Sequence, residues 1–194
     1  FVSVKNLKVS MGAMQRLDRL FSSERERIDG QEFTFRHGIE FKDASFSYEK
    51  LDILKEINFT IKKGECIGIV GSSGSGKTTI LNLLSGLYDL DSGLVNISGY
   101  NINDWRLDNL RSNYGFIGQD TYLFPGTILE NIRYGNPYAL DEDIIKLSKD
   151  LGVHDFIVRL DNSYETIIYQ NGKGISGGER QRIALVRAFL RNPS

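Results

Sequence analysis

The sequence predicts an α/β fold with an antiparallel β-sheet at its edge and a block of helices inserted into its core. Three observations lead to this prediction. An apolar run at 66–70 is followed by a glycine-rich loop and then by apolar residues at helical spacing. Residues 39–61 alternate between apolar and polar side chains, which is typical of β-strands. From about 125 to 175 the apolar residues recur every three or four positions, as on the buried face of a helix.

The glycine-rich loop has the pattern of a phosphate-binding loop. It comprises Gly71, Ser72, Ser73, Gly74, Ser75, Gly76, Lys77, Thr78 and Thr79. Glycines let successive backbone N–H groups turn towards one anion, and the following helix directs its positive end to the same place. In this pattern Lys77 reaches the β- and γ-phosphates, and the Thr78 hydroxyl is placed to ligand Mg²⁺. The loop, with an expected strand before it and a helix after it, predicts a P-loop NTPase core that binds ATP or GTP.

Composition narrows the class of protein. The 194 residues include 24 Lys and Arg against 25 Asp and Glu, so no basic field indicates nucleic-acid binding. No run reaches the ~18 apolar residues of a membrane span. The single cysteine, Cys66, excludes an internal disulfide, fits a cytosolic compartment and is expected to be a small core residue. Because the chain begins at Phe1 rather than Met, we expect it to be a piece of a longer protein.

Residues 1–29 are expected to form an amphipathic helix. Apolar side chains recur at spacings of three and four, at Val4, Leu7, Met11, Met14, Leu17 and Phe21. Two interpretations are open: a helix that packs on its own domain, and a helix that connects to a missing upstream domain. The charged stretch from Ser22 to Gly30 breaks the pattern. We therefore divide the chain into a connecting segment, 1–30, and an incomplete nucleotide-binding domain, 38–194.

Strands and helices are expected to alternate on both sides of the phosphate-binding loop. Two antiparallel strands end at the turn Lys62-Lys63-Gly64, and a short strand follows the loop helix at 94–99. Residues 104–113 favour a helix, and 114–118 favour a strand that ends at Gln119. These elements predict the nucleotide-binding core and its antiparallel edge.

The block from about 125 to 175 interrupts this alternation. Thr127 and Asp141 are candidate N-caps because both are residues that accept hydrogen bonds from a first helical turn. The block is therefore expected to be a separate helical subdomain inserted into the core. A further helix is expected to begin at Ser176.

The start of this last helix has an unusual composition. Ser176 followed three residues later by Glu179 forms a capping box, but the two residues between them are Gly177 and Gly178. Glycine destabilises a helix by about 1 kcal/mol relative to alanine. Bare backbone at a helix start suits the close approach of an anion, so we expect a second anion-binding element here.

Together with the phosphate-binding loop, the stretch from Gly174 to Leu185 resembles the signature motif of ATP-binding-cassette (ABC) transporter ATPases. Tyr48 is similar to the family's aromatic residue that stacks on adenine, and Gln119 is similar to its glutamine-loop residue. The stretch 125–132 resembles the entry to the helical subdomain in exporter-type members. The amphipathic helix stands where exporters join their last membrane helix to the ATPase. The resemblance implies the ATP-binding domain of an ABC exporter, with ATP and Mg²⁺ as cofactors.

The resemblance also implies how the site is completed. In this family two ATP-binding domains close head to tail, and each ATP lies between the phosphate-binding loop of one domain and the signature helix of the other. The signature residues implied to contact the partner's ATP are Ser176, Gly177, Gly178 and Glu179. Lys77 and Gln119 are the implied catalytic residues, and Thr78 and Gln119 the implied residues beside Mg²⁺. The other implied partner is a transmembrane domain of the same transporter, which places this domain at the cytoplasmic face of the cell membrane.

Three departures from the family pattern are visible. Ile175 and Glu179 replace the usual Leu and Gln of the signature, and Glu179 adds a negative charge that a helix N-terminus favours. Gln170 stands where exporters usually show a glutamate that contacts the membrane domain. The chain ends at Ser194, before the family's Walker B strand with its metal-supporting aspartate and general-base glutamate. We therefore expect the isolated polypeptide to be soluble, inactive as an ATPase and prone to associate through exposed strand edges.

Two other function classes are alternatives. A soluble ABC ATPase that acts on nucleic acid or ribosomes shares these motifs, but the balanced charge and the exporter-like stretch 125–132 argue against it. A P-loop kinase or GTPase is disfavoured by the signature helix and by Gln119. The preference for ATP over GTP rests on Tyr48 alone, because stacking distinguishes the purines poorly. The transported substrate is selected in the membrane domain and is not encoded here.

Overall fold

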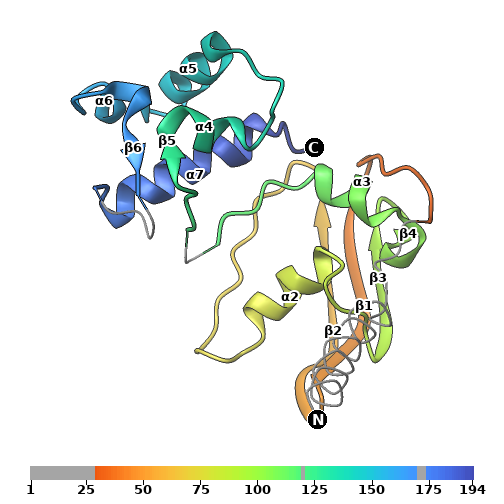
Figure 1. Ribbon diagram of the computed structural model, residues 1–194. Helices are drawn as coiled ribbons and strands as arrows, with labels where there is room; N and C mark the ends of the chain where they lie inside the picture. The colour runs from red at the N-terminus through yellow and green to blue at the C-terminus, as the bar shows by residue number, and fades with distance from the viewer. Residues whose placement is uncertain (1–28, 119–120, 170–173) are drawn as a thin grey trace, which may run out of the picture.

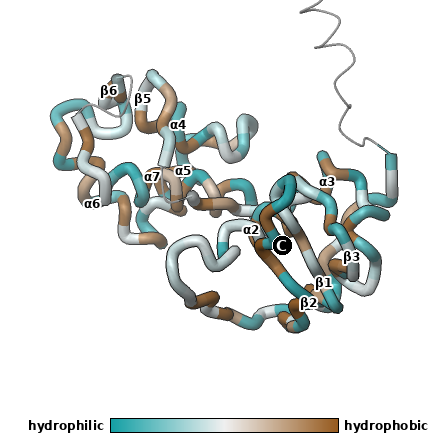
Figure 2. Tube along the Cα trace, turned by 90° about the horizontal axis from the view of Figure 1, so that it is seen from below, coloured by the Kyte–Doolittle hydropathy of each residue, from teal (hydrophilic) through white to brown (hydrophobic). Residues whose placement is uncertain are grey.

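The computed structural model describes residues 29–118, 121–169 and 174–194. The helix expected at 1–29 lies outside the described residues except for Asp29, and so do Gln119 and Gln170. The described chain forms two bodies, each with its own hydrophobic core, and both Figure 1 and Figure 2 show them apart. We call residues 29–118 the sheet body and the described residues from 121 to 194 the helical body.

The sheet body is built on four antiparallel strands. Their order in the sheet is β2 (Leu51–Lys62), β1 (Gly38–Tyr48), β3 (Ser92–Ile97) and β4 (Tyr100–Asn101). β1 and β2 form a hairpin, and β1 is also hydrogen-bonded to β3 on its other side. The antiparallel edge predicted from the period of two is therefore confirmed.

A bulge in β1 explains why its apolar residues change phase. Phe41 and Ala44 are both buried although they lie three residues apart, which a regular strand would place on opposite faces. Asp43 between them has a φ of 47°, and the register shifts between Phe41 and Ala44. The side chain of Asn58 on β2 accepts a hydrogen bond from the Asp43 backbone N–H at 2.9 Å. The bulge keeps Phe41, Ala44 and Phe46 on the buried face.

Helices cover this buried face. α2 (Lys77–Leu84), the 3₁₀ turn η1 (Ile102–Asp104) and α3 (Leu107–Ser112) supply side chains to one cluster with the sheet. Its buried members are Phe33, Phe41, Ala44, Phe46, Leu54, Ile80, Leu83, Val95, Ile97, Ile102, Trp105, Leu107 and Leu110. α2 therefore lies on the sheet through Ile80 and Leu83, with its first turn held above the β1–β2 hairpin.

The segment before β1 is fastened to the far edge of the sheet body. Gln31 bridges Trp105 in parallel register, through a bond from Gln31 N to Asp104 O of 2.8 Å and one from Arg106 N to Gln31 O of 3.0 Å. The ring of Phe33 then meets Trp105 edge to face, with centroids 5.2 Å apart. The chain thus crosses the sheet body before it enters β1.

The helical body contains four helices and a two-stranded ribbon among its described residues. The elements are β5 (Gly126–Thr127), α4 (Ile128–Arg133), α5 (Asp141–Asp150), α6 (His154–Ile157), the 3₁₀ turn η2 (Ser163–Glu165), β6 (Ile167–Ile168) and α7 (Gly177–Leu190). β5 and β6 pair in antiparallel register and bring the start of α4 beside η2. The stretch predicted to be helical does form helices.

α7 belongs to the core of the helical body. Ile183 and Val186 are fully buried in the same cluster as Ile128, Ile132 and Ile144 from α4 and α5. α7 packs chiefly against α4 and also against α5. The helix that carries the signature motif is therefore held by the helical body rather than by the sheet body.

Three local expectations are wrong. Residues 66–70 form no strand and are exposed, with Val70 at 92% and Cys66 also exposed rather than in a core. Residues 114–118 form no strand either. A strand needs a hydrogen-bonded neighbour, and among the described residues neither segment has one. In α5 the N-cap is Leu140, and Asp141 is the first residue of the helix.

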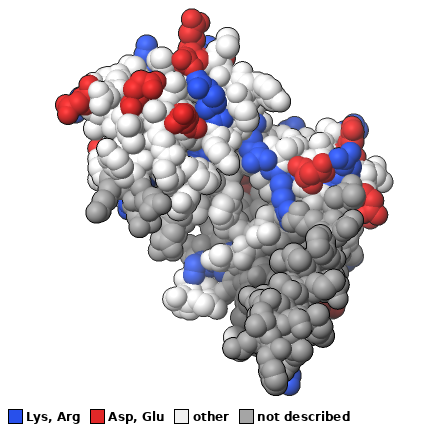
Figure 3. All heavy atoms as spheres, in the orientation of Figure 1, with Lys and Arg blue, Asp and Glu red and all other residues white. Residues whose placement is uncertain are grey.

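Surface properties agree with the composition. Within the described ranges, no helix is long and apolar enough to cross a membrane. On the face drawn in Figure 3, acidic side chains lie on both bodies and basic side chains lie between them, so both signs of charge are present on this face.

Candidate functional site

The turn before α2 requires glycine at Gly76. This residue is the N-cap of α2 and has a φ of 86°, in the left-handed region. A Cβ there would lie 2.7 Å from Leu54 Cδ2 and 3.1 Å from Ile53 Cγ2 on β2. Only a residue without a side chain lets the loop turn this close to the hairpin. The sheet body therefore sets where the phosphate-binding loop begins its helix.

Lys77 lies inside the curve of this loop. Its ammonium donates hydrogen bonds to the carbonyl oxygens of Gly71 at 2.9 Å and Ser72 at 2.6 Å, with Ser75 Oγ at 3.4 Å. The Ser75 N–H closes a turn on the Ser72 carbonyl at 3.3 Å. The loop thus curls around a positive charge that remains next to the start of α2.

The N-terminus of α2 is open to an anion. No side chain caps it, and its first turn contains no acidic residue. The Thr78 side chain is exposed beside Lys77, whereas Thr79 is buried. Free N–H groups, the positive end of the helix dipole and the Lys77 ammonium all favour negative charge here. The donor set fits a polyphosphate, and the Thr78 hydroxyl fits a ligand for a divalent cation.

Tyr48 is brought beside this helix by the fold. It is the last residue of β1, and its phenolic oxygen accepts a hydrogen bond from Asn82 Nδ2 on α2 at 3.4 Å. Its ring contacts those of Phe46 and Tyr88, with centroids 4.8 and 5.1 Å away. The predicted aromatic residue therefore lies near the C-terminal end of α2, and the predicted phosphate-binding loop lies at its N-terminal end.

The predicted signature forms a capped helix start in the helical body. Ser176 Oγ accepts a hydrogen bond from the Glu179 N–H at 3.3 Å, and Glu179 Oε2 accepts one from the Ser176 N–H at 2.7 Å. This is the predicted capping box. The Ser176 N–H lowers the pKa of the Glu179 carboxyl below its usual range, because it bonds to the charged form.

The two glycines of this start are not required by the chain's own packing. A Cβ at Gly177 would meet only the end of the Arg180 side chain, at 3.8 Å, and one at Gly178 would meet nothing within 4 Å. Figure 1 shows the start of α7 well apart from the loop before α2. The structure therefore does not bring Ser176–Glu179 to the phosphate-binding loop of the same chain.

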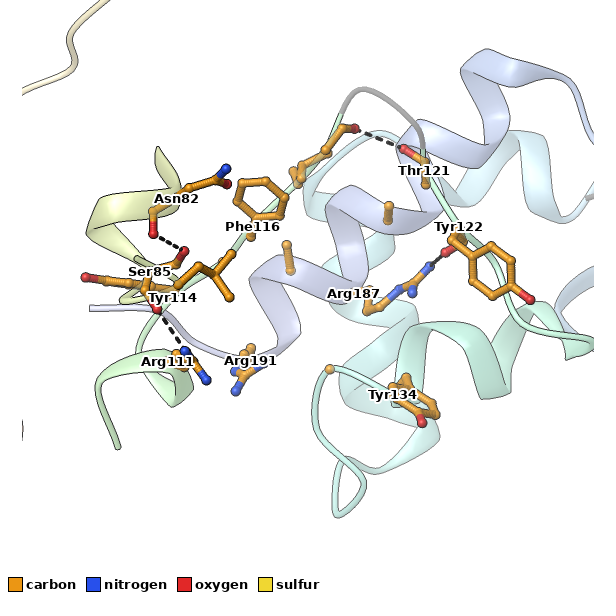
Figure 4. A pocket seen from close by; sticks show the side chains of 17 residues that line it. Asn82, Ser85, Arg111, Tyr114, Phe116, Thr121, Tyr122, Tyr134, Arg187 and Arg191 are labelled. Carbon is orange, nitrogen blue, oxygen red and sulfur yellow. Dashed lines mark hydrogen bonds between the residues drawn. The ribbon is translucent and has the colours of Figure 1, made fainter. Parts of the chain in front are cut away.

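A cavity of 570 Å³ lies between the two bodies, lined by the end of α2, residues 114–118 and α7 (Figure 4). Its arginines are directed at backbone carbonyls. Arg111 donates to Ser85 O at 2.8 Å, and Arg187 donates to Tyr122 O at 3.0 Å. Gly118 and Thr121, which flank the undescribed Gln119, also line it. The cavity is mainly apolar and separate from the open end of α2.

Sequence reasoning missed two residues that surround Tyr48. Asn82 and Tyr88 follow the phosphate-binding loop but belong to no motif, and only the fold brings them to Tyr48. The remaining predicted loop residues, Gly71 to Ser75, are exposed around Lys77.

Comparison with known proteins identifies the family to which this arrangement belongs. The model of the ABC transporter family matches residues 54–194. The chain belongs to the ABC transporter family. Membership implies ATP binding, and the match includes the phosphate-binding loop, α2 and the signature start of α7.

Individual ABC proteins resemble almost the whole chain. ABC transporter B family member 4 of Dictyostelium discoideum is 40% identical over 190 residues, which are 95% of this chain and 25% of that protein. The ABC transporter ATP-binding protein YfiC of Bacillus subtilis is 45% identical over 156 residues, 80% of this chain and 26% of that protein. The chain therefore spans about a quarter of the length of these relatives.

A solved structure shares the fold. The structure of a bacterial Atm1-family ABC exporter with ATP bound matches with a TM-score of 0.89 and 32% identity, over 96% of this chain and 33% of that chain. The α/β ABC ATPase fold predicted from the sequence is confirmed.

Proposed function

We propose that this chain is the ATP-binding part of an ABC exporter and that it couples ATP binding and hydrolysis to movement of a substrate across a membrane. The observation that carries the proposal is the uncapped start of α2, with Lys77 at its first position and with Tyr48 of β1 hydrogen-bonded to Asn82 of the same helix. The similarity to an ABC exporter solved with ATP bound supports it. The balanced charge gives no support to a nucleic-acid-binding ABC ATPase.

Each part of the site has a proposed task. The backbone N–H groups of the phosphate-binding loop and the Lys77 ammonium bind the phosphates, and the Thr78 hydroxyl ligands Mg²⁺. The cation supplies charge neutralisation for phosphoryl transfer. Tyr48 stacks on the adenine. Gln119, which lies outside the described residues, is proposed to sense the metal and the γ-phosphate.

A second ATP-binding domain is proposed to complete the site head to tail. Ser176, Gly177 and Gly178 would then contact the phosphate held by the partner, with Glu179 maintaining the cap. The exposed start of α7, its distance from the chain's own loop in Figure 1 and its dispensable glycines support this arrangement. The other proposed partner is a transmembrane domain of the same transporter, which would place this chain at the cytoplasmic face of the membrane. The similarity to a solved exporter supports this proposal.

We further propose that the 194-residue chain by itself binds ATP without hydrolysing it. The Lys77 ammonium donates its hydrogen bonds to loop oxygens, and within the described residues no carboxylate is hydrogen-bonded to Lys77 or Thr78. Hydrolysis needs a group that orients and deprotonates the attacking water. Steady phosphate release by the purified chain, abolished in Lys77→Ala, would contradict this proposal.

The binding proposal is tested by titration of the chain with fluorescent ATP and Mg²⁺. Lys77→Ala is expected to weaken binding by about 10- to 100-fold, because it removes a charged hydrogen-bond donor to phosphate. Tyr48→Ala is expected to weaken it less. Lys146→Ala, an exposed lysine on α5, is the matched control and should bind as the wild type does. Equal affinity of the wild type and Lys77→Ala would refute the proposed site.

A further inference from the structure

The Tyr48 ring is held by two other aromatic rings, one from its own strand and one from the segment after α2. Phe46, on the same strand, is buried and meets the Tyr48 ring at 90° with centroids 4.8 Å apart. Tyr88, in the segment after α2, meets it at 85° with centroids 5.1 Å apart. The rings of Phe46 and Tyr88 also contact each other, with centroids 5.5 Å apart. The three rings form one cluster in edge and tilted geometries, which favour attraction between aromatic quadrupoles.

The end of α2 sets the place of Tyr88. The chain reverses there through Gly86, which has a φ of 63°, and the Leu87 N–H bonds back to the Asn82 carbonyl at 3.1 Å. This closure of a helix C-terminus by a left-handed glycine fixes the direction of the next residues. Tyr88 follows directly and turns back to Tyr48. Asn82 thus anchors the turn through its carbonyl and contacts Tyr48 through its side chain.

Tyr48 itself lies at the end of β1, where few backbone hydrogen bonds hold the chain. It pairs with Leu51 at the tip of the β1–β2 hairpin, and the next residue, Glu49, has a φ of 54°. Hairpin tips are held by few backbone bonds, so the ring plane of Tyr48 depends on its side-chain neighbours. Phe46 limits the ring from within the core, whereas Tyr88, 46% exposed, limits it from the solvent side.

We propose that Tyr88 is a positioning residue for nucleotide-base recognition, which it serves by fixing the ring plane of Tyr48. This inference rests on the proposed function, in which Tyr48 stacks on the base. Tyr88 acts through Tyr48 and not through the phosphates, since the loop that holds Lys77 is at the other end of α2. Loss of Tyr88 therefore lowers the affinity for the base and leaves the affinity for the triphosphate group unchanged.

The test compares two ligands with the 194-residue chain in the presence of Mg²⁺: ATP and inorganic triphosphate. By calorimetry, Tyr88→Ala is expected to weaken ATP binding by about 3- to 10-fold, the worth of an aromatic pair, and to leave triphosphate binding within about 2-fold. Tyr88→Phe keeps the ring and should restore ATP affinity. A general loss of folding would weaken both ligands, so the ratio of the two affinities isolates positioning.

Tyr100→Ala is the matched control. Tyr100 is also about half exposed and also meets a buried aromatic ring edge to face, Trp105 at 5.2 Å, but it lies on β4. It should change neither ligand. The double variant Tyr48→Ala/Tyr88→Ala should bind ATP as Tyr48→Ala alone does, because Tyr88 then has no ring to hold.

The outcomes separate the two proposals. If Tyr88→Ala lowers ATP affinity further in the Tyr48→Ala background, Tyr88 contacts the nucleotide directly. If Tyr88→Ala alone leaves ATP affinity unchanged, Tyr48 needs no support from Tyr88. Either result overturns this inference and leaves the proposed function intact. Equal ATP affinity of Tyr48→Ala and the wild type would show that Tyr48 does not stack on the base, and the positioning role of Tyr88 would then be refuted as well. Failure of Lys77→Ala to weaken either ligand would instead refute the proposed function.

Discussion

The helices α2 and α7 carry the two predicted anion-binding motifs of this chain, and they begin in opposite ways. α2 follows a left-handed glycine, has no side-chain cap and has no acidic residue in its first turn. α7 begins with a complete capping box and carries Glu179 at its third position. The first therefore presents free donors to several phosphate oxygens, while the second already satisfies part of its first turn and bears a negative charge.

This difference suggests a division of labour between the two motifs. α2 and Lys77 are proposed to bind a polyphosphate within one chain, because donors and positive charge converge there. The start of α7 lacks such a convergence within its own body, since Glu179 offsets part of the dipole. It is better suited to add contacts to a phosphate that another element already holds.

The largest expected effect tests the close packing before α2. Gly76→Ala would force a side chain into the left-handed region and against Leu54 and Ile53, and we expect it to destabilise the sheet body by about 2–4 kcal/mol. Gly64→Ala is the control, because Gly64 has a similar φ of 80° and nothing within 4 Å. Urea unfolding measures both, and equal losses would show that packing against β2 contributes nothing.

Removal of the α7 cap is expected to have an intermediate effect. Ser176→Ala deletes the acceptor for the Glu179 N–H and should destabilise the helical body by about 1 kcal/mol. Thr127→Ala on α4 removes the same kind of capping box and should behave alike. Urea unfolding followed by circular dichroism is the measurement. A stability as high as that of the wild type in Ser176→Ala would contradict the role of the cap.

The glycines of α7 are expected to respond in the opposite direction from Gly76. Gly178→Ala places a Cβ in open space within a helix, so it should stabilise the helical body by about 0.5 kcal/mol. The same substitution is expected to weaken only the ATP-dependent association of two chains, which light scattering in the presence of ATP measures. Destabilisation of the isolated chain would show that Gly178 is needed for its own fold.

The smallest expected effect is a pH dependence at α7. The folded-state pKa of Glu179 is lowered, so its charge stabilises the fold above the ordinary carboxyl pKa of 4.5, and this contribution is lost as the pH falls through the folded value. Glu179→Gln keeps the cap without the charge and should be less stable by about 0.3 kcal/mol at pH 7, because water screens the charge. Thermal unfolding at pH 7 and below pH 4 should show this difference vanish in acid.

Much of the site was predictable because it depends on contacts within a few residues. The contacts within the phosphate-binding loop and within the two capping boxes join residues at most six positions apart, so the sequence pattern implies the geometry. The hairpin of β1 and β2 followed from its period of two, but the alternation alone did not predict the bulge at Asp43, which only the structure shows.

The wrong expectations concern segments whose state depends on distant neighbours. An apolar run such as 66–70 predicts a buried strand only where another strand is hydrogen-bonded to it, and the described chain supplies none. The burial of Cys66 was inferred from that strand and was wrong with it. The sequence likewise did not predict that α7 packs in the helical body. Ile183 and Val186 indicate a buried face of the helix, but they do not indicate which elements cover that face.

The sequence by itself predicted the elements of the proposed site. They are a loop with the phosphate-binding pattern around Lys77 and Thr78 and a signature helix capped by Ser176 and Glu179, and together they indicated the ABC family. The tertiary structure decided which of these elements meet. It brings Tyr48 into contact with Asn82 of α2 and with Tyr88 after α2, and it packs the signature helix into the core of the helical body. Local hydrogen bonds are encoded in short patterns, whereas contacts between distant segments depend on how whole hydrophobic faces are buried together.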